Sequence, residues 1–236
     1  MEQESHSSGR TGVLVENDHR SPIHFIRKVN RIAYDHLLPA LLCLVPAYAT
    51  VTRLISSINS AEWFSSLRLA LVLAFFLLIS LLFITRYPIK SLRARPFEAL
   101  VALLGTFAPV LFSLIPLRHP DRSILILGDI VIILGYSWSL FSLAGLGRSF
   151  GLFPEVRGLV TRGPYKIVRH PLYLGELVAL FGLMLPVFSP LAMVLFILAA
   201  GLQIWRTYLE ERALLAFFPQ YASIVSRTAR IIPWIW

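Results

Sequence analysis

Residues 158–176 read GLVTRGPYKIVRHPLYLGE, a short basic stretch that leads directly into an apolar run. Pro171 restricts His170 to an extended conformation and suits the first turn of a helix, so we expect a helix to begin at about Pro171. The free backbone N–H groups of Leu172 and Tyr173 would then point back toward the loop, at the positive end of the helix dipole. The stretch therefore predicts a seat for a carboxylate or phosphate at this helix start.

The same stretch supplies positive charge and aromatic faces. Arg162, Lys166 and Arg169 would surround the seat, while Tyr165 and Tyr173 could stack against a heterocycle. Basic residues beside a membrane helix are, however, often only determinants of topology. The stretch by itself leaves both interpretations open.

A second polar segment, WRTYLEERALLAFFPQYASIVSR, covers residues 205–227 at the far end of a long apolar run. Arg206 and Glu210 are four residues apart and would share a helix face. They could simply pair with each other at the membrane boundary. Alternatively, Arg206, Glu210 and Glu211 could face the basic stretch and complete a site with it.

Composition identifies a membrane protein. The chain has 236 residues, of which 56% are hydrophobic, and a mean hydropathy of +0.70, far above that of an ordinary soluble domain. The net charge is +9, but the basic residues lie in short loops between apolar runs. Anionic lipid headgroups and topology explain this charge better than nucleic acid does. We therefore expect membrane lipids as partners and no nucleic acid.

The predicted fold is an all-α integral membrane protein with about six transmembrane helices. A bilayer-crossing helix needs about twenty apolar residues. The run over residues 172–209 is too long for one span, and Pro186 and Pro190 interrupt it, so we expect two helices joined by a tight turn as a hairpin. The other predicted spans cover about residues 36–55, 67–85, 97–117 and 123–146.

The chain divides into four parts. Residues 1–22 are polar and mixed in charge, which predicts a disordered tail. Residues 23–35 have apolar residues on a helical spacing opposite basic ones, which predicts an amphipathic helix at the membrane surface. Residues 36–147 hold the first four membrane helices. Residues 148–236 hold the basic loop, the hairpin and an amphipathic C-terminal tail.

Loop charges predict the orientation. Lys and Arg concentrate before the first span, after the second, after the fourth and after the sixth, whereas the alternate loops hold few. Cytoplasmic loops carry the excess of basic residues. We expect both termini on the cytoplasmic side, together with the basic stretch and the segment around Arg206 and Glu210, which could therefore meet.

Familiar catalytic motifs are missing from the sequence. It has no Gly-rich phosphate loop, no zinc-protease motif and no nucleophile elbow. His170 is the one histidine after His119, and Cys43 lies alone in an apolar run, so a protein-held metal is not expected. Asp129, within the fourth span, is expected to be a local hydrogen-bond partner. Such a chain can bind a cofactor and align two reactants without a strong base or protein nucleophile.

The string LGRSFGLFPEVRGLVTRGPYKIVRHPLYLGE, followed by the segment 205–227, resembles the isoprenylcysteine carboxyl methyltransferase family and its bacterial, phospholipid-methyltransferase-like relatives. The ordered pattern is GPYxxVRHPxYxG, a helical hairpin, EExxL and an aromatic-rich tail, over roughly residues 145–232. The resemblance implies an integral membrane enzyme that transfers the methyl group of S-adenosylmethionine to a lipidated or lipid-like acceptor. It also makes 148–236 the catalytic region, with cofactor-binding loops on the cytoplasmic side.

Matching the family motifs residue by residue gives the expected roles. Arg206 matches the arginine that orients the acceptor carboxylate. Glu210 matches the cofactor-binding glutamate, with Glu211 beside it as the alternative acid. The remaining expected cofactor contacts are Leu159, Val160, Tyr165, His170, Pro171, Leu172 and Tyr173.

The residues present suit this chemistry. The cofactor carries an amine, a carboxylate and an adenine, which need an acid, an anion seat and a stacking face. A carboxylate acceptor is already ionised at neutral pH, so in-line methyl transfer can depend on alignment and exclusion of water. Arg206 could hold such a carboxylate by a bidentate contact, and a hydrocarbon chain could enter between helices from the lipid.

Several alternatives stay open at this stage. The lipid-modified cysteine methylated by eukaryotic members is a eukaryotic product, while this compact chain looks closer to the bacterial branch, so we expect a bacterial inner membrane location. The acceptor could be an isoprenoid acid, a phospholipid amine or a small hydrophobic molecule. Two other functions fit less well: an NADPH-dependent membrane reductase for sterol-type or other lipids, and a non-catalytic membrane scaffold.

Overall fold

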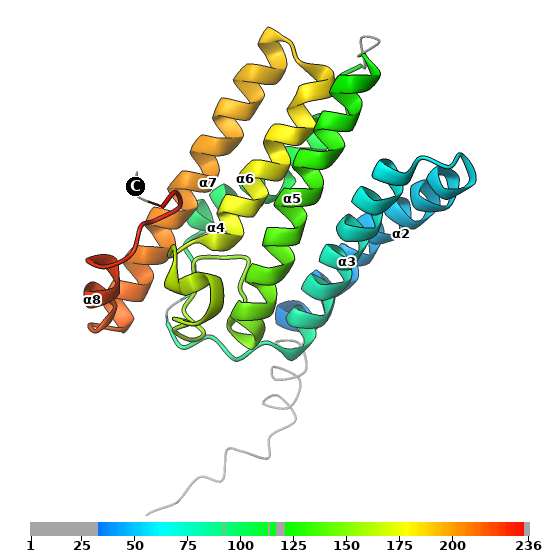
Figure 1. The fold of residues 1–236 in the computed structure, drawn as a ribbon. Helices are drawn as coiled ribbons and strands as arrows, with labels where there is room; N and C mark the ends of the chain where they lie inside the picture. Colours follow the sequence, from blue (N-terminus) through cyan, green and yellow to red (C-terminus); the bar gives the residue numbers. More distant parts are fainter. Residues whose placement is uncertain (1–32, 92, 113, 117–120, 234–236) are drawn as a thin grey trace, which may run out of the picture.

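The structure is a computed structural model that describes residues 33–91, 93–112, 114–116 and 121–233. Helices make up its regular elements, and the described residues contain no strand, only an isolated bridge between Val168 and Ala229 (Figure 1). The predicted all-α fold is confirmed. The predictions for residues 1–22 and for most of 23–35 lie outside the described residues.

In the described part of the chain, six helices form the body of the molecule, and short helical turns join them. The order is η2 (Ala33–Leu37), α2 (Leu38–Asn59), α3 (Trp63–Thr85), α4 (Pro96–Phe112), α5 (Arg122–Leu146), η3 (Gly147–Ser149), η4 (Gly163–Lys166), α6 (Pro171–Met184), η5 (Leu185–Val187), α7 (Pro190–Phe217) and α8 (Tyr221–Val225).

Four of these helical stretches are long and apolar enough to cross a membrane: Tyr34–Asn59, Trp63–Thr85, Arg122–Ser149 and Pro190–Phe217. The shorter apolar helices are Pro96–Phe112 and Pro171–Val187. The protein is therefore embedded in a membrane. Helix α4 ends at Phe112, before the predicted Leu117, and Pro116 disfavours helical conformation in the residue before it.

The predicted hairpin is present between α6 and α7. The chain turns through η5, and Ser189 caps α7 by accepting a hydrogen bond from the N–H of Ala192 at 3.2 Å. Pro190 occupies the first turn of α7, where its missing N–H costs nothing.

Helix α7 is longer than the predicted span. The apolar run was expected to end at about residue 209, but α7 continues without interruption to Phe217. The residues from 209 to 216 are mostly Leu, Glu, Arg and Ala, which favour helix, and Pro219 ends it. Arg206, Glu210 and Glu211 therefore all lie on this continuous helix.

The contact between α5 and α6 depends on glycine. A Cβ added at Gly135 would lie 2.5 Å from the backbone nitrogen of Ala179 and 2.7 Å from the carbonyl oxygen of Gly175. Any side chain at Gly135 would therefore force the two helices apart. This close approach fixes the start of α6, and with it His170, against the end of α5.

Helices α2 and α3 pack against each other and tilt away from the bundle formed by α4 to α7 (Figure 1). Large apolar side chains such as Leu41, Val45 and Tyr48 are exposed on α2, as expected for a surface that faces lipid. On α3, Arg68 pairs with Asp129 of α5 at 2.8 Å and Ser65 donates to the same carboxylate. Asp129 is thus a local hydrogen-bond partner.

Candidate active site

The loop between α5 and α6 is held by contacts on two sides. Gly163 has a positive φ of 59°, which glycine adopts without strain, and it opens the turn that carries Tyr165. The N–H groups of Arg169 and His170 donate to the carbonyls of Ala229 and Arg230 in the C-terminal segment. Loop residues far apart in sequence are thereby fixed at one end of the helix bundle.

The segment between α3 and α4 holds the other side of this loop. The N–H of Tyr87 donates to the carbonyl of Arg148, and the N–H of Lys90 donates to that of Val156. Arg157 is buried, donates to the carbonyl of Tyr87 at 2.6 Å and pairs with Glu155 at 3.2 Å. Burial lowers the pKa of the Arg157 guanidinium, and Glu155 partly offsets this effect.

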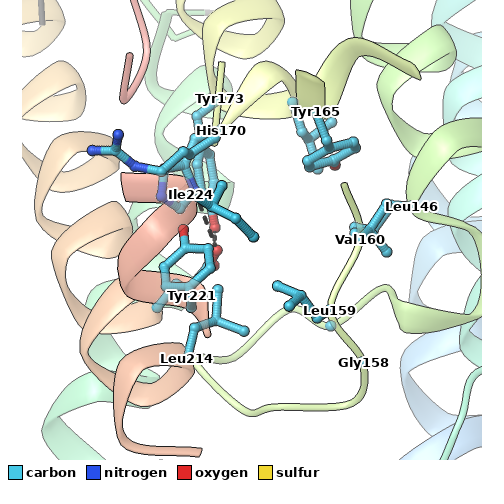
Figure 2. A pocket seen from close by; sticks show the side chains of 14 residues that line it. Leu146, Gly158, Leu159, Val160, Tyr165, His170, Tyr173, Leu214, Tyr221 and Ile224 are labelled. Atoms are coloured by element: carbon cyan, nitrogen blue, oxygen red, sulfur yellow. Dashed lines mark hydrogen bonds and ion pairs between the residues drawn. The ribbon is translucent and has the colours of Figure 1, made fainter. Parts of the chain in front are cut away.

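The loop, α6, α7 and α8 enclose a pocket that contains about 650 Å³ of space, open solvent included. In Figure 2, Leu159, Val160 and Leu146 lie across the hollow from Leu214 and Tyr221. The residues that line it are Leu146, Gly151, Gly158, Leu159, Val160, Tyr165, Arg169, His170, Leu172, Tyr173, Glu210, Leu214, Tyr221 and Ile224.

His170 lies between two carboxylates in the wall of this pocket. Its Nδ1 is 3.7 Å from Oε2 of Glu210, and its Nε2 is 3.2 Å from Oε1 of Glu211. Glu210 also accepts a hydrogen bond from the hydroxyl of Tyr173. The basic stretch and the segment after the hairpin therefore meet, as the sequence predicted from topology.

Glu211 points away from the pocket into a cluster of cations. Its carboxylate pairs with Arg169 at 2.6 Å and with Arg230 at 2.8 Å, and its side chain is almost fully buried. Arg169 also donates to the backbone carbonyls of Val225 and Thr228. Glu211 thus joins α7, the loop and the C-terminal segment into one wall.

Two tyrosines stay neutral in the pocket. Burial raises the pKa of the Tyr165 phenol, and the nearby carboxylate of Glu210 raises it further. Burial also raises the pKa of the Tyr221 phenol, with a contribution from Glu211. Both rings therefore present uncharged aromatic faces over the physiological pH range.

Most of the predicted cofactor contacts lie in this one pocket. Leu159, Val160, Tyr165, His170, Leu172, Tyr173 and Glu210 line it. Pro171 starts α6 behind them, and Glu211 lies in the cation cluster. Of the basic residues expected around the site, Arg162 and Lys166 are exposed to solvent.

Arg206 does not pair with Glu210 in the described part of the chain. One terminal nitrogen donates to the amide oxygen of Gln203 at 2.9 Å and lies 3.3 Å from the hydroxyl oxygen of Thr106, while the other donates to the carbonyl of Leu152 at 3.2 Å. The guanidinium carbon lies 4.8 Å from the centre of the Tyr173 ring. Arg206 is buried, and it packs against Tyr173, which lines the first pocket.

A second, apolar cavity lies deeper among the helices and contains about 1260 Å³ of space by the same measure. Its lining comes from α2 to α7 and is mostly aliphatic or phenyl, including Phe75, Ile79 and Leu183. Phe150 and Leu152 line this cavity while Gly151 lines the first pocket, so the two hollows adjoin at this segment. Its polar lining residues are Thr106, Tyr136, Glu176 and Gln203.

Sequence reasoning missed several of these residues. Tyr221 and Ile224 come from the C-terminal tail, which was expected only to be amphipathic. Glu176, the last residue of the stretch 158–176, was not predicted to have a role, whereas Asp129 was considered as an acid within a span. An acid inside an apolar run is itself a signal of function, and it could have identified Glu176.

The comparison with known families adds an independent observation. Residues 123–220 match the phospholipid methyltransferase family. This family is related to the isoprenylcysteine carboxyl methyltransferases, so the resemblance predicted from the sequence is confirmed. A search of curated proteins finds no match. The family match and the apolar helices support a membrane methyltransferase of the lipid or isoprenylcysteine type.

The matched segment contains the hairpin and most of the first pocket. It begins in α5 and ends just before Tyr221, so it includes His170, Tyr173, Arg206 and Glu210. Among the described residues, no group of three or more His, Cys, Asp and Glu side chains could hold a metal ion.

Proposed function

We propose that this protein transfers a methyl group from S-adenosylmethionine, bound in the first pocket, to a lipid-like acceptor bound in the apolar cavity. The observation that carries the proposal is the contact between His170 and Glu210, in which Nδ1 lies 3.7 Å from Oε2. Both residues line the first pocket, and both belong to the segment that matches the methyltransferase family.

The chemistry of the pocket wall fits this cofactor. Glu210 offers a carboxylate for the amino group of the cofactor, and Tyr165 and Tyr221 offer neutral faces for its adenine. No side chain caps the start of α6, and Leu172 and Tyr173 lie in its first turn, where backbone N–H groups suit a carboxylate. The pocket thus has a partner for each polar part of the molecule.

When bound, S-adenosylmethionine supplies a methyl group on a positively charged sulfur. The chain would hold the reactants in line and exclude water, which can lower the barrier without a protein nucleophile. Tyr173 contributes to both tasks because its hydroxyl holds Glu210 and its ring lies against Arg206. Of the cations near the pocket, Arg169 is paired with the carboxylate of Glu211 at 2.6 Å, which offsets its repulsion toward a sulfonium.

We assign the acceptor to the apolar cavity because a hydrocarbon chain would match the apolar lining of the cavity and could enter from the lipid. The two hollows adjoin at residues 150–152, which suits transfer from one to the other. The sequence predicts a carboxylate acceptor oriented by Arg206. That part remains a prediction, since both terminal nitrogens of Arg206 already have acceptors within the protein.

The charge distribution supports a cytoplasmic position for the first pocket. The loop between α5 and α6 is rich in Arg and Lys, and such loops remain on the cytoplasmic side. We extend the proposal to a bacterial inner membrane with both termini in the cytoplasm.

Calorimetric titration of the purified protein in lipid nanodiscs tests the cofactor assignment. Wild-type protein should bind S-adenosylmethionine, and Glu210→Ala and His170→Ala should each abolish measurable binding. Lys166→Ala is the matched control, because Lys166 is exposed on the same loop, and it should bind as wild type does. Retained affinity in both pocket variants would remove the assignment.

A parallel titration with NADPH separates the reductase alternative from methyl transfer. The proposal expects S-adenosylmethionine to bind and NADPH not to bind. Binding of NADPH alone would favour the reductase, and binding of neither would favour a scaffold that retains the fold.

A further inference from the structure

Glu176 brings a carboxylate into the wall of the apolar cavity. It lies on α6, one turn after Tyr173, which lines the cofactor pocket. In the described part of the chain, Gln203 is its one hydrogen-bond donor, at 2.6 Å from Oε2. Its other oxygen, Oε1, therefore has no donor from any described side chain.

The surroundings make this arrangement costly without a ligand. The cavity is lined mainly by aliphatic and phenyl groups, and Leu180 and Leu183 follow Glu176 on the same helix. A carboxylate in such an environment loses water and is retained only when it gains a partner. Ionisable residues at membrane depth accordingly mark sites of function.

Gln203 cannot be reoriented to relieve Glu176. Its amide nitrogen donates to Glu176, and its amide oxygen accepts from Arg206 at 2.9 Å. Turning the amide around would place its oxygen against the carboxylate and its N–H₂ group against the guanidinium, where no hydrogen bond can form. Glu176 and Arg206 therefore fix Gln203 in one orientation.

Two other polar groups at this end of the cavity are committed within the protein. Thr106 donates its hydroxyl proton to the carbonyl of Ala102 at 2.8 Å, and Arg206 is committed to Gln203 and to the carbonyl of Leu152. The donors that remain in the lining are the hydroxyl of Tyr136 and the second N–H of the Gln203 amide. A ligand entering here meets the free oxygen of Glu176 close to the adjoining cofactor pocket.

We infer that Glu176 is a specificity-determining residue that binds the polar group of an amphiphilic acceptor, and that this polar group is a hydrogen-bond donor, a hydroxyl or an amine. The inference rests on the proposed function for the identity of the cavity ligand as the methyl acceptor. It departs from the carboxylate predicted by the sequence, because a carboxylate beside Glu176 would bring two anions together, while both terminal nitrogens of Arg206 already donate to Gln203 and to the carbonyl of Leu152.

The test compares amphiphiles that share one saturated hydrocarbon chain and end in an alcohol, an amine or a carboxylate. Their affinities are measured without cofactor, by displacement of a fluorescent fatty probe from the protein in neutral lipid nanodiscs. Because a hydrogen bond to a charged group is stronger than one between neutral groups, the alcohol or the amine should bind about tenfold more tightly than the carboxylate.

Glu176→Gln should remove most of this preference, since the new amide can donate to a carboxylate. The control is Glu62→Gln, an exposed acid before α3, which should leave the preference unchanged. S-adenosylmethionine should bind Glu176→Gln as it binds wild type, which also shows that the variant is folded. If that variant fails to fold, the wild-type preference alone decides the inference.

Equal or tighter binding of the carboxylate by wild-type protein would overturn the inference, as would a preference that survives in Glu176→Gln. Comparing the affinities of the alcohol and the amine shows which of the two donor classes the cavity prefers. Failure of the proposed function gives a different result, because wild-type protein would then not bind S-adenosylmethionine, whereas the amphiphile preference is measured without it.

Discussion

The two hollows of this protein share helices α6 and α7 but differ in what lines them. The first pocket, where we propose that the cofactor binds, is lined by a loop, helix starts and a short terminal helix, and its wall contains His170, Glu210 and Tyr221. The apolar cavity is lined by the sides of membrane helices, with Glu176 as its carboxylate. A polar ligand needs closely placed backbone and side-chain groups, whereas a hydrocarbon chain needs only apolar space. The difference predicts that variants can impair one hollow and leave the other intact.

The largest expected effect comes from the helix contact on which both hollows depend. Gly135→Ala would place a Cβ 2.5 Å from the backbone of α6, so the helices must separate. We expect a loss of about 3 kcal/mol of unfolding free energy and weaker binding in both hollows. Thermal unfolding in nanodiscs measures the loss of stability. Gly201→Ala is the control, since nothing lies within 4 Å of the added atom, and it should be as stable as wild type. Equal stability of the two variants would contradict this packing account.

The adjacent glutamates of α7 should separate stability from binding. Glu211→Ala leaves Arg169 and His170 without a shared carboxylate, and removal of one buried partner costs about 3 kcal/mol. Glu210→Ala removes a partly exposed group and should cost only about 1 kcal/mol, yet it should abolish cofactor binding. Thermal unfolding and calorimetry on both variants measure the two effects. The same loss of stability in both would show that the two acids play one structural role.

Filling the apolar cavity should affect only the acceptor. Ile79 lines the cavity on α3, so Ile79→Trp should lower methyl transfer to a lipid-like acceptor by about tenfold and leave S-adenosylmethionine affinity unchanged. Leu81→Trp is the control, because Leu81 lies on the same helix and is 54% exposed. A fall in cofactor affinity with Ile79→Trp would mean that the two hollows are one site. Transfer by Ile79→Trp at the wild-type rate would mean that the acceptor binds elsewhere.

The smallest expected effect concerns the exposed basic residues of the loop. Arg162→Ala and Lys166→Ala remove charges that lie at the surface and outside the pocket lining. Surface charges contribute little, so S-adenosylmethionine affinity should change by less than about twofold. Calorimetry at low and high salt measures this. A tenfold loss at low salt would show that these residues attract the ligand after all.

Much of the fold could be predicted because a membrane span requires a long run of apolar residues, which the sequence shows directly. The runs near residues 67–85 and 123–146 appear as α3 and α5 with nearly the predicted bounds, and Pro186 and Pro190 mark the hairpin. The extension of α7 to Phe217 was missed because charged residues were taken as the end of a helix. Helix propensity and Pro219 set the end instead.

The first pocket was more predictable than the apolar cavity for a physical reason. The pocket depends on a local motif in which Pro171 starts a helix and places His170 at its cap, so spacing along the chain carries the information. The cavity depends on how α2 to α7 pack, which no local spacing records. The roles of Glu211 and Arg206 were likewise set by partners far away in sequence, such as Arg230 and Thr106.

An experimental structure in lipid nanodiscs with S-adenosylhomocysteine bound tests the central claim most directly. We expect the ligand in the pocket between Leu159 and Tyr221, with its amino group within hydrogen-bond distance of Glu210 and its sulfur on the side of Tyr173 that faces the apolar cavity. Density for the ligand elsewhere, or a filled pocket in which Glu210 faces away from it, would contradict the account.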